Sequence, residues 1–246
     1  CAREAAAAAK AAGVQQAVVL SSVGAQHGHG TGPVNVLRGV EEAFAAALPS
    51  TVNLRAGFFM ENLLRDLSTI AATGSMFAAV PPSASFSMVA TRDIAARAAA
   101  HLLSPRQSGA YTTGAHGPKD MTYGEVAAIL SDVLARPVAF VPITVEQARH
   151  GMQSAGMPDF MANAYAEMYE GVNRGLMAAA EPRTAETTTP TTLRSFAREV
   201  LRPGDEVLVP AMTYFASAAA VNWQGAVPVF VDAITSMSIQ DGFNLL

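Results

Sequence analysis

The feature that most constrains the fold is an alternation of short apolar runs with helix-forming segments. Residues 17–22 (AVVLSS) form a continuous apolar run after a turn at Gly13, which is typical of a strand buried on both faces. Residues 35–47 repeat apolar side chains at helical spacing, with Val36, Val40 and Phe44 among them, and Pro49 ends this segment before a strand over residues 51–55. This order predicts a parallel sheet covered by helices.

The same mixture of elements continues along the chain. Further helices are predicted over residues 2–12, 59–72, 92–103, 123–134, 160–177 and 192–201, and further strands over residues 75–80, 86–89, 110–113 and 138–143. The expected fold class is α/β, a partial Rossmann-like parallel sheet with helices on both faces. After Pro203, a strand over 205–209, a helix over 214–223 and a strand over 227–231 predict a short appended βαβ unit.

Composition narrows the class of protein. Half of the 246 residues are hydrophobic and 15% are charged, which suits a globular chain, and a net charge of -4 without basic runs argues against a nucleic-acid partner. The single cysteine, Cys1, cannot close an internal disulfide, and no apolar run is long enough for a membrane helix. We therefore expect a soluble, cytoplasmic protein. Because Cys1 leads straight into an alanine-rich helix without a cap, we expect the start to be a cut.

Three stretches in this order resemble the NmrA-like family, which consists of atypical relatives of the short-chain dehydrogenases and reductases. They are VVLSSVGA at residues 18–25, LRAGFFMENLL at residues 54–64 and PRTAETTTPTTLRSFAREV at residues 182–200. The resemblance covers most of residues 1–201. It implies an NAD(P)-binding domain over residues 1–202 that lacks its amino-terminal half, and NAD(P)H-linked reduction of a small quinone-like or carbonyl substrate.

The resemblance also implies a cofactor site, whose expected residues are Ser21, Ser22, Arg38, Gly57, Phe58, Phe59 and Asn62. Ligands of open parallel sheets bind beyond the carboxyl ends of the strands, where both serines and the glycine are expected. The two phenylalanines would supply an apolar wall for a flat ring, and the Asn62 amide would hydrogen-bond a carboxamide. The alternatives are that the serines only finish a strand and that the phenylalanines belong to the core.

The sequence departs from the family in two places. The glycine-rich fingerprint that grips the pyrophosphate has no counterpart, because the glycines between residues 24 and 32 follow the wrong strand and have the wrong spacing. The helix over residues 35–47 also lacks the Tyr-x-x-x-Lys pair of classical reductases. Arg38 is its nearest basic group, and it would hold a ribose or phosphate, or else simply pair with Glu42 one turn on. We expect weak or absent dinucleotide binding, and no catalytic residue is assigned.

Other polar residues have simpler interpretations. His27 and His29 lie in a glycine-rich loop without a third ligand, so a solvated loop is favoured over a metal site. Glu61 is expected in the first turn of a helix, and Asp93 is expected to cap or charge the start of the next one. The segment over residues 160–177 is expected to pack through Met161, Tyr165, Met168, Val172 and Leu176, or to shape the substrate side.

From Pro203 the sequence PGDEVLVPAMTYFASAAAVNWQGAVPVFVD resembles a second family, the DegT/DnrJ/EryC1/StrS aminotransferases, which use pyridoxal phosphate. Residues 203–246 contain no lysine for a Schiff base, so no pyridoxal phosphate is expected on this fragment. Two classes of function stay open for the whole chain. One is a reductase, and the other is a non-catalytic module that senses dinucleotide, with a protein partner; a non-functional fusion fragment is the third possibility.

Overall fold

The three strands β1 (Gln16–Ser22), β2 (Ser50–Ala56) and β6 (Gly109–Ala115) form a parallel sheet in the order β1-β2-β6. The computed structural model describes residues 2–104 and 108–201. The middle strand β2 is buried along almost its whole length, as the continuous apolar run predicts. The expected strands at 17–22, 51–55 and 110–113 are therefore confirmed.

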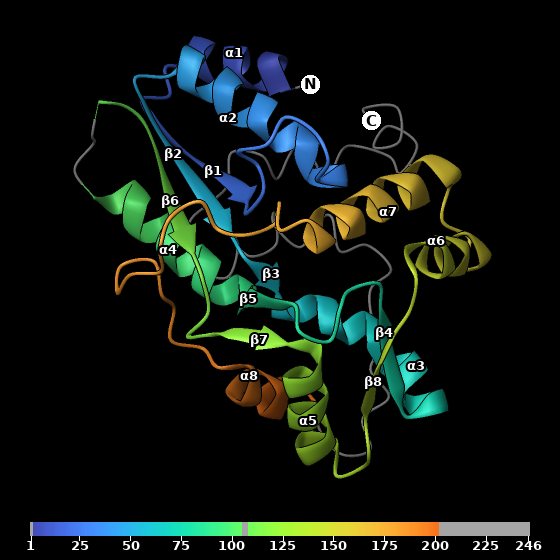
Figure 1. The fold of residues 1–246 in the computed structure, drawn as a ribbon. Helices are drawn as coiled ribbons and strands as arrows, with labels where there is room; N and C mark the ends of the chain where they lie inside the picture. Colours follow the sequence, from blue (N-terminus) through green and yellow to red (C-terminus); the bar gives the residue numbers. More distant parts are fainter. Residues whose placement is uncertain (1, 105–107, 202–246) are drawn as a thin grey trace.

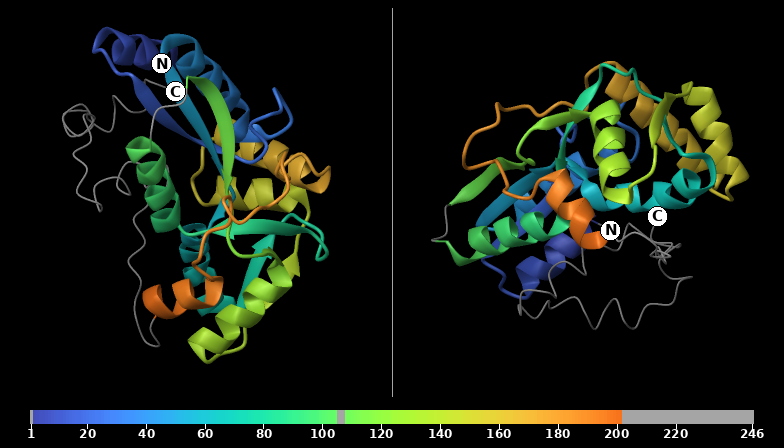
Figure 2. Two further views of the ribbon diagram at one scale, coloured as in Figure 1. Left: turned by 90° about the vertical axis from the view of Figure 1, so that its left-hand side faces the viewer. Right: turned by 90° about the horizontal axis from the view of Figure 1, so that it is seen from below.

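Helices cover both faces of this sheet (Figure 1, Figure 2). The helices α1 (Ala2–Ala11) and α2 (Asn35–Ala47) pack together on one face, and α4 (Thr91–Leu103) packs on the other. A short 3-10 turn, η1 (Gly32–Val34), leads into α2. Between the sheet and α4 lies a small apolar core of Leu54, Ala56, Val89, Ile94 and Ala115. The predicted α/β class with helices on both faces is confirmed.

The remaining elements form a second layer with its own core. Strand β3 (Phe58–Phe59) pairs in parallel with β5 (Ser85–Val89), β5 pairs antiparallel with β7 (Asp120–Thr122), and β4 (Ser75–Ala78) pairs in parallel with β8 (Ala139–Pro142). The helical elements are η2 (Met60–Asp66), α3 (Leu67–Thr73), α5 (Tyr123–Leu134), α6 (Val145–Ser154), α7 (Asp159–Asn173) and α8 (Leu193–Val200). Their core contains Met60, Met76, Met88, Val126, Leu130 and Phe196, among others.

One predicted helix begins later than its sequence pattern suggests. The expected helix over residues 59–72 is a 3-10 segment followed by α3, and Phe59 belongs to strand β3 instead. The reason is tertiary, because Phe58 and Phe59 lie opposite Met88 and Val89 of β5 and are held extended by that pairing. The spacing of apolar residues within one segment cannot indicate a strand partner that lies 30 residues further along the chain.

Helix α7 ends at Asn173, earlier than the predicted residue 177, and small residues are buried beside its half-buried predicted face. Its buried positions are the small residues Ala162, Ala166 and Gly171. A Cβ atom on Gly171 would lie 2.3 Å from the carbonyl oxygen of Gly30, so the backbone of the glycine-rich loop lies against this position. A Cβ atom on Gly32 would lie 2.0 Å from the carbonyl oxygen of Ala164. The glycines of this loop therefore serve close packing onto α7.

Strand β1 forms the edge of the described sheet, since β2 is its only partner among residues 2–104 and 108–201. An unpaired strand edge is a site of self-association unless something covers it. The βαβ unit predicted over residues 203–246 lies outside the described residues, and the boundary at residue 202 stays a prediction. Within the described part of the chain, no helix is sufficiently long and apolar to span a bilayer.

Candidate functional site

The three parallel strands end in register at one edge of the sheet. Ser22 of β1 is opposite Ala56 of β2, and Ala56 is opposite Ala115 of β6. The pattern continues one step further, because the amide of Val23 donates to the carbonyl of Ala56 and that of Gly57 donates to Ala115, each at 3.0 Å. Ligands of open α/β sheets bind beyond the carboxyl ends of the strands, so this edge is the candidate site.

A buried polar cluster lies just behind this edge. Glu41 of α2 accepts two hydrogen bonds from Arg55 of β2, from Nε to Oε1 at 2.9 Å and from Nη2 to Oε2 at 2.7 Å. The Ser21 hydroxyl donates to Glu41 Oε1 at 2.5 Å. Side chains of Glu41 and Arg55 are only 7% and 13% exposed, and hydrogen bonding to Glu41 raises the pKa of Arg55. The cluster locks α2 onto the ends of β1 and β2.

Glu41 and Arg55 were missed by the sequence interpretation, although one signal was present. Glu41 lies four residues after Leu37 and three before Phe44, so it falls on the inward face of α2. Val36, which was taken as part of that face, is 68% exposed. A carboxylate at an inward helical position indicates a buried partner, because an unpaired buried charge is strongly unfavourable.

The two predicted serines have different surroundings. Ser21 is 3% exposed and its hydroxyl donates to Glu41, so its side chain helps to hold the edge in place and is not available to a ligand. Ser22 is half-buried, and its hydroxyl donates only to the neighbouring carbonyl of Val23 at 3.0 Å. Ser22 is thus the serine whose hydroxyl can turn to a ligand at this edge.

Gly57 has a structural reason to be glycine. A Cβ atom there would lie 2.6 Å from the carbonyl oxygen of Ser87, which is closer than van der Waals contact allows. The Ser87 hydroxyl beside it is buried and has no hydrogen-bond partner among the described residues. The missing side chain lets β5 approach the turn between β2 and β3.

Phe58 and Phe59 pack on opposite cores while staying half-buried. Phe59 contacts the core between the sheet and α4, and Phe58 contacts the core of the second layer. Phe58 begins an aromatic row in which ring centroids are separated by 5.6 Å to Phe86, 4.9 Å from Phe86 to Tyr123, and 5.0 Å from Tyr123 to Phe140. These spacings are those of interacting aromatic pairs.

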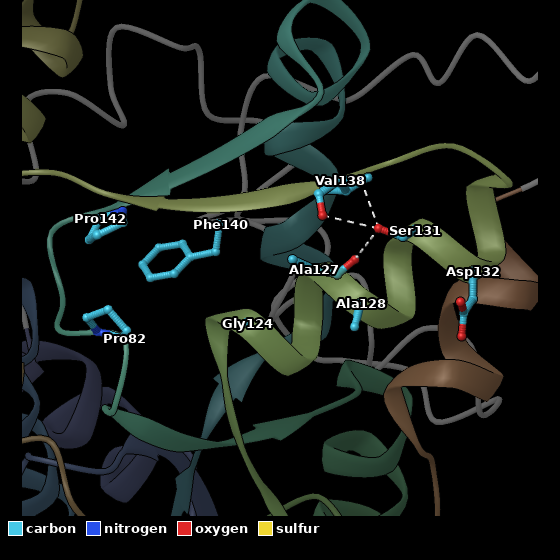
Figure 3. Close-up of a pocket in the computed structure, with 9 residues that line it drawn as sticks. All are labelled: Pro82, Gly124, Ala127, Ala128, Ser131, Asp132, Val138, Phe140 and Pro142. Atoms are coloured by element: carbon cyan, nitrogen blue, oxygen red, sulfur yellow. Dashed lines mark hydrogen bonds between the residues drawn. The ribbon is translucent and has the colours of Figure 1, made fainter.

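The far end of this row lines a pocket of about 590 Å³ between α5 and β8 (Figure 3). Phe140, Pro82 and Pro142 line one side, and small residues of α5 line the other side. Ser131 anchors the strand to the helix, because its hydroxyl accepts from the amide of Val138 at 2.8 Å. None of the sequence-predicted site residues lines this pocket.

Glu61 and Asn62 follow the phenylalanines on η2. Glu61 caps α4 from a distance, since its Oε1 accepts from the amide and the hydroxyl of Thr91 at 3.0 and 2.7 Å. Asn62 is half-buried, and its backbone carbonyl accepts from Arg65. No hydrogen bond of the Asn62 side-chain amide to another described residue is present, so this amide can serve a ligand.

Asp93 does not cap its helix with its side chain. Its carboxylate accepts from the amide and the hydroxyl of Thr191, at 3.0 and 2.9 Å, and so ties α4 to the loop before α8. The predicted start of the last helix is confirmed, because Thr192 caps α8.

Arg38 lies on the outer surface of α2. It forms an ion pair with Glu42 at 2.9 Å, and the two side chains are 52% and 65% exposed. A second, longer contact of 3.4 Å joins its Nη1 to the carbonyl of Gln26. This is the surface pairing that the sequence offered as the alternative to a role in cofactor binding.

The amino-terminal end of η1 and α2 already holds a carboxylate. Glu167 of α7 accepts from the amide of Gly30 at 2.7 Å and from the side chain of Asn35 at 3.2 Å. A helix amino terminus attracts anions, and here Glu167 supplies the negative charge. His29 is exposed in the same loop, and no cluster of three metal-binding side chains exists in the part of the chain that the structure describes.

The chain is similar to known proteins in sequence and in structure. Residues 186–240 match the DegT/DnrJ/EryC1/StrS aminotransferase family, and this match begins before Pro203 and lies mostly outside the described residues. The NAD(P)H azoreductase of Xenophilus azovorans is 36% identical over 166 residues, which are 66% of this chain and 56% of that protein. The chain therefore spans about half the length of this curated relative.

Solved structures share the fold at lower identity. The NADPH-dependent quinone oxidoreductase of Escherichia coli, solved with NADPH, has a TM-score of 0.69 and 22% identity, covering 80% of this chain and 70% of that chain. A nucleoside-diphosphate-sugar epimerase from Staphylococcus aureus scores 0.68 at 19% identity, covering 80% and 69%. Citrobacter sp. triphenylmethane reductase with NADP(H) scores 0.63 at 19% identity, covering 81% and 70%. The predicted Rossmann-like fold and both sequence resemblances are confirmed.

Proposed function

We propose, on the premise of this resemblance to NmrA-like reductases, that residues 1–202 form an NAD(P)H-linked oxidoreductase domain. Its substrate would be a small quinone-like or carbonyl compound, or an azo compound like that implied by the relative's name. The observation that carries this proposal is the 36% identity to an NAD(P)H azoreductase, which spans 166 residues. A parallel sheet with an in-register carboxyl edge supplies the matching geometry.

The described residues fit the ring end of a nicotinamide dinucleotide. Phe58 and Phe59 are half-buried aromatic side chains beside the edge, Asn62 offers a side-chain amide, and Ser22 and Gly57 allow close approach to the backbone. The bound nicotinamide would supply a hydride. We propose that these five residues hold its ring and exclude water from one face.

Neither the start of η1 and α2 nor Arg38, both considered for the cofactor's phosphates, is free to bind them. The helix amino terminus nearest the edge is occupied by Glu167, whose charge would repel a phosphate. Arg38 is engaged with Glu42 on the outer face of α2. We therefore propose that this chain contacts the nicotinamide ring of the cofactor but binds the whole dinucleotide weakly.

The chemistry required of the protein is modest. Reduction of a quinone to the hydroquinone, or of an azo bond to the hydrazine, consumes one hydride and one proton, and α2 carries neither tyrosine nor lysine to deliver the proton. We propose that water delivers it, while the cluster of Ser21, Glu41 and Arg55 holds the edge in place. The protein would then accelerate the reaction by orienting the cofactor and the substrate more than by acid catalysis.

A dinucleotide-sensing module without turnover is the second candidate. The missing tyrosine and lysine on α2 favour it, because binding needs no proton donor. Such a module would act through a protein partner, whereas the reductase needs only its small-molecule substrate. Neither candidate requires nucleic acid.

NADPH oxidation with a panel of quinones and azo compounds separates these candidates. Turnover supports the reductase, binding without turnover supports the sensor, and the absence of both contradicts the two. Replacing Asn62 by Ala should weaken NADPH binding about fivefold, the cost of one hydrogen bond. Asn163→Ala, on the exposed side of α7, is the matched control and should leave binding unchanged.

A further inference from the structure

Three buried nitrogen atoms without a hydrogen-bond partner gather beyond the end of β6. Within the described residues they are His116 Nδ1, Arg97 Nε and Arg183 Nε. His116 directly follows β6 and is 4% exposed, Arg97 comes from α4, and Arg183 comes from the segment between α7 and α8. Buried polar groups are normally paired, so three unpaired ones in one region require an explanation.

The two guanidinium groups lie near the same imidazole. Burial is the largest effect that lowers the pKa of His116, and the positive charges of Arg183 and Arg97 lower it further. Asp120 and Glu181 act in the opposite direction. These four charged groups come from three parts of the chain, which are α4, β7 and the segment between α7 and α8.

The position of His116 is fixed by the surrounding backbone. Its amide donates to the carbonyl of Thr187 at 2.9 Å, and its carbonyl accepts from the amide of Thr189 at 2.7 Å and from the Thr189 hydroxyl at 3.0 Å. The segment that carries Arg183, coloured orange, runs beside the end of β6 in Figure 1. A Cβ atom on Gly114 would lie 2.3 Å from His116 Nε2, so the glycine makes room for the ring.

The charge of this cluster is only partly balanced. Arg183 forms an ion pair with Asp120 through Nη2, which leaves its Nε free of partners. Arg97 has no ion pair or hydrogen bond with any residue that the structure describes, and Glu186 influences it only at longer range. A guanidinium Nε–H can only donate, so its missing partner must be an acceptor.

We propose that Arg97, His116 and Arg183 form a binding site for an oxyanion, the carboxylate, sulfonate or phosphate group of a small molecule. The two Nε–H groups donate to its oxygens, and His116 donates from Nδ1 in the matching tautomer. The site adjoins the carboxyl edge of the sheet. At this edge the amide of Gly57 donates a hydrogen bond to the carbonyl of Ala115, the residue before His116. It does not depend on the reductase reaction.

Direct titration tests this site on the full chain. Inorganic phosphate, benzoate and benzenesulfonate are added separately to protein with isotope-labelled histidine, and the ring signals of the five histidines are followed by nuclear magnetic resonance. We expect one imidazole signal, assigned by its loss in His116→Gln, to shift and saturate. The three probes distinguish which oxyanion geometry is preferred.

Variants decide whether the shift comes from this cluster. Arg97→Met should raise the dissociation constant roughly tenfold, the loss of one charge-assisted hydrogen bond. Arg198→Met, which removes an exposed arginine on α8, controls for net charge and should change nothing. If Arg97→Met does not fold, Arg97→Lys keeps the charge but loses Nε–H and should still weaken binding. No saturable shift of His116, or equal weakening by Arg97→Met and Arg198→Met, overturns the proposal.

Discussion

Replacing Glu41 by Gln tests the buried polar cluster most directly. Glutamine keeps the size of the side chain but removes its charge, which leaves Arg55 as an uncompensated cation with only 13% of its side chain exposed. Three hydrogen bonds to the carboxylate are weakened together, at 2.5, 2.7 and 2.9 Å. Removing one partner of a buried ion pair costs about 3–5 kcal/mol.

That magnitude is large compared with the ~5–15 kcal/mol stability typical of a domain. We expect urea denaturation, followed by circular dichroism, to show a loss of about 3–5 kcal/mol in the free energy of unfolding. The midpoint of thermal unfolding should fall by on the order of 10 °C. The double variant Glu41→Gln with Arg55→Met should recover part of the loss, because no buried charge then lacks a partner.

The neighbouring pair supplies the control. Glu42→Gln breaks the exposed ion pair with Arg38 on the same helix, and exposed pairs contribute only about 0.3–0.5 kcal/mol. A loss for Glu41→Gln as small as that for Glu42→Gln would refute the reasoning. A double variant whose loss equals the sum of its single variants would show that Glu41 and Arg55 are not coupled.

Two further predictions follow from the packing. Burial raises the pKa of Asp66 from 3.8 to about 6, so the folded state favours the neutral acid, and stability should fall as pH rises from about 4 to about 6. Asp66→Asn should remove this slope and add ~2 kcal/mol at neutral pH, as measured by urea denaturation across that range; an unchanged slope contradicts the assignment. Gly57→Ala places a methyl group 2.6 Å from the Ser87 carbonyl oxygen and should cost ~1–3 kcal/mol, whereas a neutral effect would mean that β5 can move away.

Much of the local structure was predictable from the sequence. The helices at 35–47 and 123–134 were predicted with the bounds that the structure has, because apolar spacing, and for the second helix the Thr122 cap, act within one element. The edge where Ser22 and Gly57 lie followed from the rule that parallel strands end on the same side of a sheet. Their role in binding a cofactor stays a prediction.

Other features required the tertiary structure. Phe59 was expected in a helix and lies in β3, because its strand partner is 30 residues further along the chain at Val89. The predicted packing residues of α7 are half-buried, but its buried positions are Ala162, Ala166 and Gly171, because the backbone of the glycine-rich loop lies close to this helix. The periodicity of apolar residues predicts which residues share one face of a helix or strand, but not which part of the chain packs against that face.

The sequence by itself determined the alternation of strands and helices from residue 17 to residue 55, since it follows from the spacing of neighbouring residues. Only the tertiary structure decided which polar groups come together: Glu41 pairs with Arg55, and the charges of Arg97 and Arg183 act on the buried His116. The physical reason is that helix and strand patterns are local, whereas the pairing of buried charges depends on how elements distant in sequence pack. Electrostatic energies in a protein interior vary steeply with such distances, so these contacts shape the site most and are the least visible in the sequence.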